Sequence, residues 1–229
     1  MRYNRIFLCF LTCLLFFGGC QRVNATKPPE KDFLEQTVFL GDSITAHMAS
    51  RADVSPYNIW AAKARYLNLD SRITYAKIVA PDTGKEELIA EVAARIRPAY
   101  LVVTLGIDYG VYYYRNELET FAKYYEKLLD AIQTASPSTT ILLQSIFPVS
   151  AACKNLTNEM IDNANEVIRE IARRRDLPFL DTQNVLRDEN GFLREEYCYS
   201  EDGIHLNESA YAAILSYIRN KSVEMGWQA

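Results

Sequence analysis

Five short runs of β-branched and other apolar residues alternate along the chain with segments of helical spacing. Runs such as Tyr100–Val103 are apolar throughout, as expected of a strand that is covered on both faces of its sheet. Between the runs, apolar residues recur at steps of three and four, as in Phe121, Tyr125 and Leu128. This alternation predicts a parallel sheet with helices on both faces. The predicted strands are Thr37–Gly41, Ile73–Val79, Ala99–Leu105, Thr139–Phe147 and Pro178–Asp181.

The length of 229 residues is enough for one domain with a substantial core. No internal repeat, low-complexity tract or second-domain boundary interrupts the alternation. We therefore predict one α/β domain over residues 37–229, a three-layer α/β/α sandwich with a flavodoxin-like five-stranded parallel sheet. The net charge is −4 and no clustered basic surface is indicated, so we expect no nucleic-acid partner.

The N-terminal residues have the pattern of a targeting segment. A short cationic region, Met1–Arg5, precedes an apolar stretch, Ile6–Phe17, that is too short to span a bilayer. Small residues then stand directly before Cys20, which resembles the bacterial lipobox and implies lipid attachment at Cys20 after cleavage. We predict a signal peptide over residues 1–19, a polar tether over 20–36, and an exported protein anchored at the membrane surface of the cell envelope. The alternative is an ordinary signal peptide with an incidental cysteine.

Two cysteines, Cys153 and Cys198, remain in the predicted domain, each in a predicted loop. Because an exported protein meets a non-reducing environment, we predict a disulfide between them. The alternative is two unpaired thiols packed as small hydrophobic groups. Two histidines and no close cysteine pair do not make a ligand set, so we expect no metal and no cofactor.

A serine and a histidine–aspartate pair stand where predicted elements end. Ser43 follows the first predicted strand, at the edge where open α/β sheets place their sites. Asp202 and His205 are three residues apart, close enough for the carboxylate to orient the imidazole. A hydroxyl nucleophile, an imidazole base and an orienting carboxylate are the minimum set for acyl transfer.

The two ends of the domain resemble the SGNH (GDSL-type) hydrolase family. Residues 41–45 read GDSIT and residues 202–207 read DGIHLN. The resemblance implies an esterase whose nucleophile is Ser43 and whose triad is completed by Asp202 and His205. In this family a glycine between the second strand and the next helix gives a backbone amide to the oxyanion hole, beside the amide of the serine. The resemblance assigns that glycine to Gly84, for which a simple helix-start residue is the alternative.

The chain departs from the family pattern after the third predicted strand. The family has an asparagine whose amide donates to the oxyanion, and Asp108 stands in its place. An ionised carboxylate has no donor and repels an oxyanion. Three outcomes are open: Asp108 is protonated in its site, the amides of Ser43 and Gly84 suffice with slower turnover, or the protein is catalytically impaired. We expect slow but real activity, since the triad is intact.

Tyrosines crowd the segment after Asp108. Tyr109 and Tyr112 are predicted to border the site, where their rings could line an acyl pocket or stack on a sugar; packing onto the body of the domain is the alternative. His47 lies four residues beyond Ser43, and a packing role is expected for it rather than a substrate contact.

We predict a serine esterase that removes small acyl groups, such as acetyl, from glycans. Three alternatives remain open within the same fold. They are a lysophospholipase or thioesterase, an acyltransferase that moves acyl groups between envelope polymers, and a non-catalytic glycan-binding lipoprotein.

Overall fold

The computed structural model describes residues 32–227. The predicted signal peptide, Cys20 and most of the predicted tether lie outside these residues. Among the helices described, none is both long and apolar enough to cross a membrane.

Five parallel strands form the central sheet, in the order β2-β1-β5-β6-β7. By their succession in the chain this is the order 2-1-3-4-5 of a flavodoxin-like sheet, so the predicted fold class is confirmed. Strand β2 is added on one side of β1 and β5 on the other, so the strand order reverses between the parallel neighbours β1 and β5, and such sheets form a crevice at this switch point. The strands are β1 (Thr37–Gly41), β2 (Ile59–Ala61), β5 (Tyr100–Thr104), β6 (Thr140–Gln144) and β7 (Phe179–Leu180).

The second predicted strand is wrong. Residues Ile73–Tyr75 form a 3-10 helix, and β3 (Lys77–Val79) pairs antiparallel with β4 (Glu86–Leu88) in a separate two-stranded sheet. Ile78 is fully buried, so the apolar run reflects real burial in this hairpin but not membership of the main sheet. The true second strand, β2, is an edge strand of three residues that is too short to have a recognisable period.

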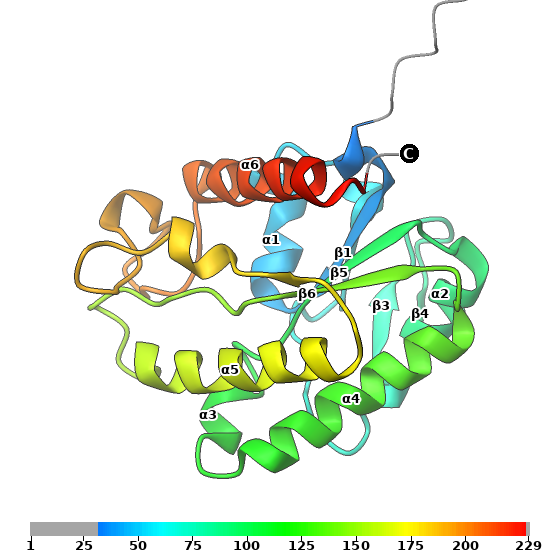
Figure 1. Ribbon diagram of the computed structural model, residues 1–229, viewed down its shortest axis with the longest axis horizontal. Helices are drawn as coiled ribbons and strands as arrows, with labels where there is room; N and C mark the ends of the chain where they lie inside the picture. Colours follow the sequence, from blue (N-terminus) through cyan, green and yellow to red (C-terminus); the bar gives the residue numbers. More distant parts are fainter. Residues whose placement is uncertain (1–31, 228–229) are drawn as a thin grey trace, which may run out of the picture. The chain divides into compact units, whose positions relative to one another are not determined.

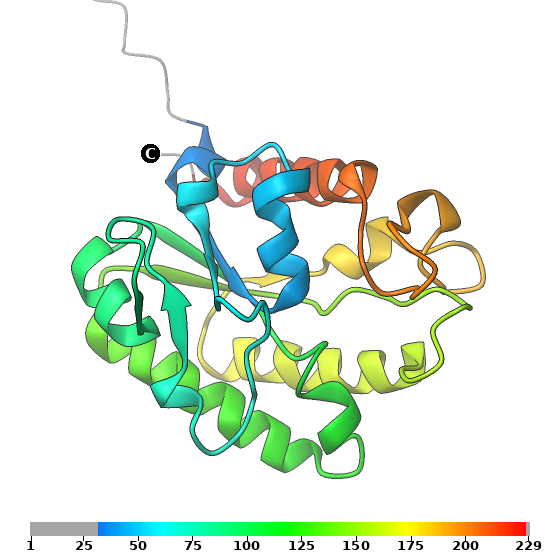
Figure 2. The same ribbon diagram turned by 180° about the vertical axis from the view of Figure 1, so that it is seen from behind.

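The described chain has six α-helices, of which α1 to α5 lie between strands and α6 follows the last strand. In both views of the ribbon, α1 and α6 lie on one side of the sheet and α4 and α5 on the other (Figure 1, Figure 2). The side chains of Thr157 and Asn207 accept hydrogen bonds from the first turns of α5 and α6, which explains where these two helices begin. The helices are α1 (Ser43–Arg51), α2 (Ile89–Ile96), α3 (Val111–Tyr114), α4 (Leu118–Ala135), α5 (Asn158–Arg174) and α6 (Glu208–Met225).

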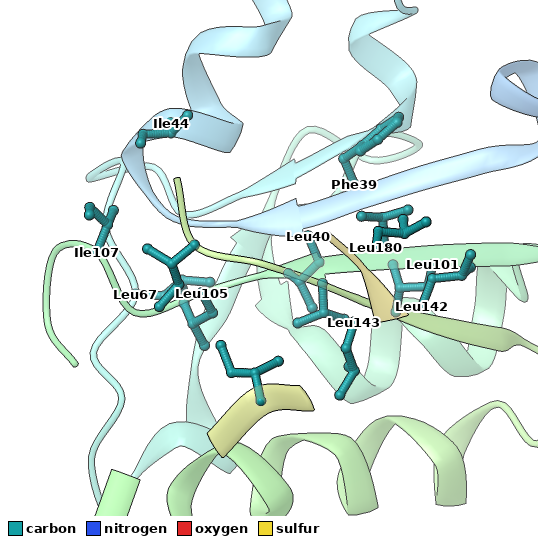
Figure 3. Packing of buried hydrophobic residues seen from close by; sticks show 14 of the residues in the cluster. Phe39, Leu40, Ile44, Leu67, Leu101, Leu105, Ile107, Leu142, Leu143 and Leu180 are labelled. Atoms are coloured by element: carbon teal, nitrogen blue, oxygen red, sulfur yellow. The ribbon is translucent and has the colours of Figure 1, made fainter. Parts of the chain in front are cut away.

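The hydrophobic core lies along the strands of the main sheet and extends to the residues that follow their carboxyl ends. Leu40, Leu101 and Leu142, from three neighbouring strands, are each at most 1% exposed. Figure 3 shows these side chains gathered along the sheet, with Ile44 and Ile107 at one end of the cluster. Ile44 immediately follows Ser43 in the chain, and Ile107 immediately precedes Asp108. Because both isoleucine side chains are buried, Ser43 and Asp108 are held at the same edge of the sheet.

Candidate active site

The turn from β1 into α1 carries Ser43, the first residue of that helix. The preceding glycine is required there, because a Cβ at Gly41 would lie well inside contact distance of Thr45 Oγ1 and the Thr104 carbonyl oxygen. The turn therefore packs directly against the end of β5. This close approach brings Ser43 near the segment that follows β5.

Asp42 anchors that neighbouring segment rather than capping α1. Its Oδ2 accepts hydrogen bonds from the amides of Gly106 and Ile107 at 3.1 and 3.0 Å, and its side chain makes no cap bond to α1. Burial, and then the charge of Asp108, raise the pKa of Asp42 to about 7, although the amide hydrogen bonds act in the opposite direction.

The loop before α6 carries the predicted base and its orienting carboxylate. His205 Nδ1 lies 2.7 Å from Asp202 Oδ2, and Asp202 Oδ1 accepts the amides of Ile204 and His205 at 2.8 and 3.0 Å. Ser200 Oγ also donates to Asp202 Oδ2, at 2.8 Å. Burial alone would raise the pKa of Asp202, but these hydrogen bonds, led by that from His205, hold it well below its usual range. Asp202 is therefore a carboxylate that accepts the Nδ1 proton, which leaves Nε2 to face the serine.

Arg51 links the serine helix to this loop. From the last turn of α1 its guanidinium stacks on the Tyr199 ring, 3.3 Å from the centroid, and donates to the Leu206 carbonyl at 3.1 Å. The Tyr199 amide in turn donates to the His205 carbonyl at 2.8 Å. These contacts set the distance between the elements that carry Ser43 and His205.

Ser43 lies between the histidine and a second carboxylate. Its Oγ is 3.3 Å from His205 Nε2 and 3.0 Å from Asp108 Oδ1, and its amide donates to Asp108 Oδ2 at 3.1 Å. Only one of the two neighbours of Oγ can accept the single hydroxyl hydrogen. Asp108 therefore competes with His205 for the hydroxyl proton and also occupies the Ser43 amide, which was expected to hold an oxyanion.

An open cavity of about 730 Å³ faces Ser43 and His205. The predicted Tyr109 and Tyr112 contribute to its wall, together with Asp108. The full set of lining residues is Ser43, His47, Ala64, Arg65, Tyr66, Ile107, Asp108, Tyr109, Tyr112, Tyr113, Asn155, Leu156, Ile204 and His205. Among residues 32–227, no cluster of three or more His, Cys, Asp or Glu side chains could hold a metal ion.

Gly84 is not part of this cavity, so its predicted role in the oxyanion hole is a misassignment. It lies with a φ of 68° in the turn of the β3–β4 hairpin, where its amide donates to the Ala80 carbonyl at 2.8 Å. The error follows from the misplaced second strand, because the segment after the true β2 is residues 62–66. From this segment Ala64, Arg65 and Tyr66 reach the cavity, and no residue-type signal in the sequence marked them.

His47 lines the cavity rather than only packing beneath it. Its ring lies edge-on to that of His205, with centroids 4.8 Å apart, and its Nε2 is 3.5 Å from Arg65 Nη1. Burial, followed by the nearby His205 and the cations Arg51 and Arg65, lowers the pKa of His47 to about 4. His47 is therefore neutral at pH 7.

Four tyrosines form a continuous aromatic surface beside the site. Tyr66 lies against Tyr109 with ring centroids 5.3 Å apart, and Tyr109 stacks on Tyr113 at 5.6 Å with an interplanar angle of 11°. Tyr112 meets Tyr113 edge-on at 5.8 Å. All four rings are more than one third exposed, so they are available to a ligand. We call this group the tyrosine cluster.

The predicted disulfide is absent, since Cys153 and Cys198 are both free thiols. Cys198 Sγ instead donates to the Arg194 carbonyl at 3.6 Å, within its own turn of the chain. Both cysteines are half-buried and pack against the core, which is the alternative that the sequence left open.

Comparison with known proteins assigns the family. Residues 39–213 match the GDSL-like Lipase/Acylhydrolase family, and this match covers most of the chain. The chain belongs to this family and is an ester-cleaving hydrolase. No curated protein sequence matches it.

Solved structures share the fold at low sequence identity. A variant of an acetyl-xylooligosaccharide esterase from Geobacillus Stearmophilus has a TM-score of 0.51 and 16% identity, covering 80% of this chain and 92% of that chain. A GDSL-like lipase from Bacteroides thetaiotaomicron has a TM-score of 0.50 and 18% identity, covering 84% and 89%. These likenesses concern the arrangement of the sheet and helices.

Proposed function

We propose that this protein is a serine esterase that removes small acyl groups, such as acetyl, from glycans. The observation that carries the proposal is the continuous chain from Ser43 Oγ to His205 Nε2, at 3.3 Å, and from His205 Nδ1 to Asp202 Oδ2, at 2.7 Å. A nucleophile, a base and a group that orients the base are all within reach of one another.

The proposed reaction has two halves. Ser43 Oγ attacks the ester carbonyl carbon while its proton passes to His205 Nε2, and His205 then protonates the leaving alcohol oxygen as the ester bond breaks. In the second half, water attacks the acyl carbon while His205 Nε2 takes a proton from it, and His205 then returns this proton to Ser43 Oγ as the bond to the acyl group breaks. Asp202 stays ionised throughout and stabilises the imidazolium that forms in each half.

An oxyanion at this site would need the Ser43 amide, which donates to Asp108 Oδ2 in the structure. When a substrate carbonyl oxygen takes the Ser43 amide, the Asp108 side chain must leave it or bind a proton. A protonated Asp108 would supply an O–H donor in place of the expected asparagine amide. The proposal therefore predicts slow turnover as long as the Asp108 side chain holds the Ser43 amide.

The glycan part of the proposal rests on the tyrosine cluster and on the N-terminal sequence. Exposed aromatic rings beside a catalytic serine suit the apolar faces of sugar rings. The lipobox-like segment that ends at Cys20 would hold the enzyme at the membrane surface of the cell envelope, within reach of cell-surface glycans. A neighbour in fold, the acetyl-xylooligosaccharide esterase, is named for a substrate of this class.

A fluorophosphonate probe tests the reactive serine, and acetate release from acetylated xylan tests the substrate class. We expect the probe to label Ser43 and the label to be lost in Ser43→Ala. Ser50→Ala, at an exposed position in the last turn of the same helix, is the matched control and should still be labelled. Labelling with no acetate release, beside clear hydrolysis of lysophospholipid, would instead favour a lysophospholipase.

A further inference from the structure

Arg65 stands in the wall of the active-site cavity without an acidic partner. Among residues 32–227, no carboxylate lies within 4.0 Å of its guanidinium, and its one polar side-chain contact is the 3.5 Å approach of Nη1 to His47 Nε2. Other arginines, such as Arg95 and Arg187, hold carboxylates of the same chain. A guanidinium left unpaired in a concave site is available to an anionic ligand.

Arg65 lies in a tight turn after β2. Arg65 has a φ of 63°, in the left-handed region that glycine adopts without strain and that residues with a Cβ rarely adopt. Its amide donates to the Ala62 carbonyl at 2.8 Å, which closes the turn after β2. Glycine would satisfy this turn as well, so the turn geometry by itself does not require an arginine at this position.

No neighbouring group of the described residues pairs directly with the Arg65 cation. The neighbouring His47 is neutral at pH 7 and can only accept a hydrogen bond from it. The two carboxylates of the site are already engaged, Asp108 by the amide and hydroxyl of Ser43 and Asp202 by His205. Arg65 is also the only Lys or Arg side chain among the described residues that line the cavity.

The tyrosine cluster begins at the next residue, Tyr66, so planar rings and a fork-shaped cation line the same cavity. We propose that Arg65 binds a carboxylate on the alcohol portion of the ester, and that the enzyme acts on acylated acidic glycans built from uronic acids. The sugar ring would stack on the tyrosine cluster while its carboxylate meets the guanidinium. This inference rests on the proposed esterase function and narrows its substrate class.

Two matched probes test the inference: an O-acetylated galacturonic acid oligomer, and the same oligomer with its carboxyl groups converted to primary amides. The measured quantity is the ratio of kcat/KM for acetate release from the acid and from the amide. A charged hydrogen-bonded pair makes the acid about 10- to 100-fold better for the wild-type protein. Arg65→Gln should bring this ratio close to one, and Arg65→Lys should keep part of the preference.

Lys63→Gln is the matched control. It removes the same charge two residues away, on an exposed side chain that does not line the cavity, and should keep the wild-type ratio. A wild-type ratio near one, or an equal fall of the ratio in Lys63→Gln and Arg65→Gln, would overturn the assignment of Arg65. Failure of the proposed function gives a different result: the wild-type protein is either not labelled by fluorophosphonate at Ser43, or is labelled and releases no acetate from the acid or the amide oligomer.

Discussion

Replacing Asp108 by asparagine should make this enzyme faster, although the residue touches the nucleophile directly. In the wild-type protein Asp108 accepts the Ser43 amide at 3.1 Å and the Ser43 hydroxyl at 3.0 Å. An asparagine keeps the size of the side chain, competes less strongly for the hydroxyl hydrogen because its oxygen is uncharged, and presents an N–H donor in place of an anion.

The size of the effect follows from the value of one oxyanion donor. Removing such a donor typically costs about 100- to 1,000-fold in kcat, or about 2.7–4 kcal/mol. We expect Asp108→Asn to gain about 100-fold, at the lower end of this range. The reason is that the variant also loses the attraction between the Asp108 carboxylate and a protonated His205 in the transition state.

The assay is steady-state hydrolysis of nitrophenyl acetate at pH 7, with Asp108→Ala as the matched control. The alanine variant removes the anion but adds no donor, so it separates relief of blocking from the gain of a hydrogen bond. Asp108→Asn should exceed Asp108→Ala by at least about tenfold. An Asp108→Asn variant that is no faster than the wild-type protein on any ester would refute the placement of this side chain in the oxyanion hole.

Two further predictions concern stability. Because the pKa of Asp42 is raised from 3.8 to about 7, the folded protein holds a proton there that the unfolded chain has lost, and stability falls as pH rises from about 4 to 7. The free energy of unfolding should fall by up to about 4 kcal/mol over this range. In urea unfolding at a series of pH values, Asp42→Asn should make the free energy of unfolding less dependent on pH. The same pH dependence in both proteins would contradict the raised pKa. Gly41→Ala should cost about 3 kcal/mol and lower Tm by roughly 10 °C, because its Cβ would meet Thr45 Oγ1 and the Thr104 carbonyl. An unchanged melting temperature in a calorimetric scan would show that this turn relaxes freely.

The sequence predicted those parts of the site that depend on local pattern. Ser43 could be placed at a strand end because the apolar run before it stops at a Gly-Asp-Ser turn. Asp202 and His205 could be paired because three residues of loop cannot separate them far. The meeting of Ser43 with His205 also followed, since both belong to motifs whose combination is specific to one family.

The misassignment of Gly84 and the failure to recognise Arg65 have the same physical cause, which is the misplaced second strand. A three-residue edge strand, β2, is defined by its pairing with β1 and not by any period of its own. The apolar residues of Ile73–Val79 satisfy burial in a hairpin just as well, so pattern alone selects the wrong segment. Gly84 was misassigned as a result, and Arg65 was not recognised.

The sequence by itself determined the fold class, four of the five strands of the main sheet and the identities of the three residues of the proposed triad. These depend on the alternation of apolar runs with helical spacing and on short motifs, which are properties of neighbours in the chain. Only the tertiary structure decided which turn forms the wall of the cavity, that Asp108 is bound to Ser43, and that Arg65 has no acidic partner among the described residues. Each of these depends on side chains brought together from distant segments, and no local pattern encodes such distances.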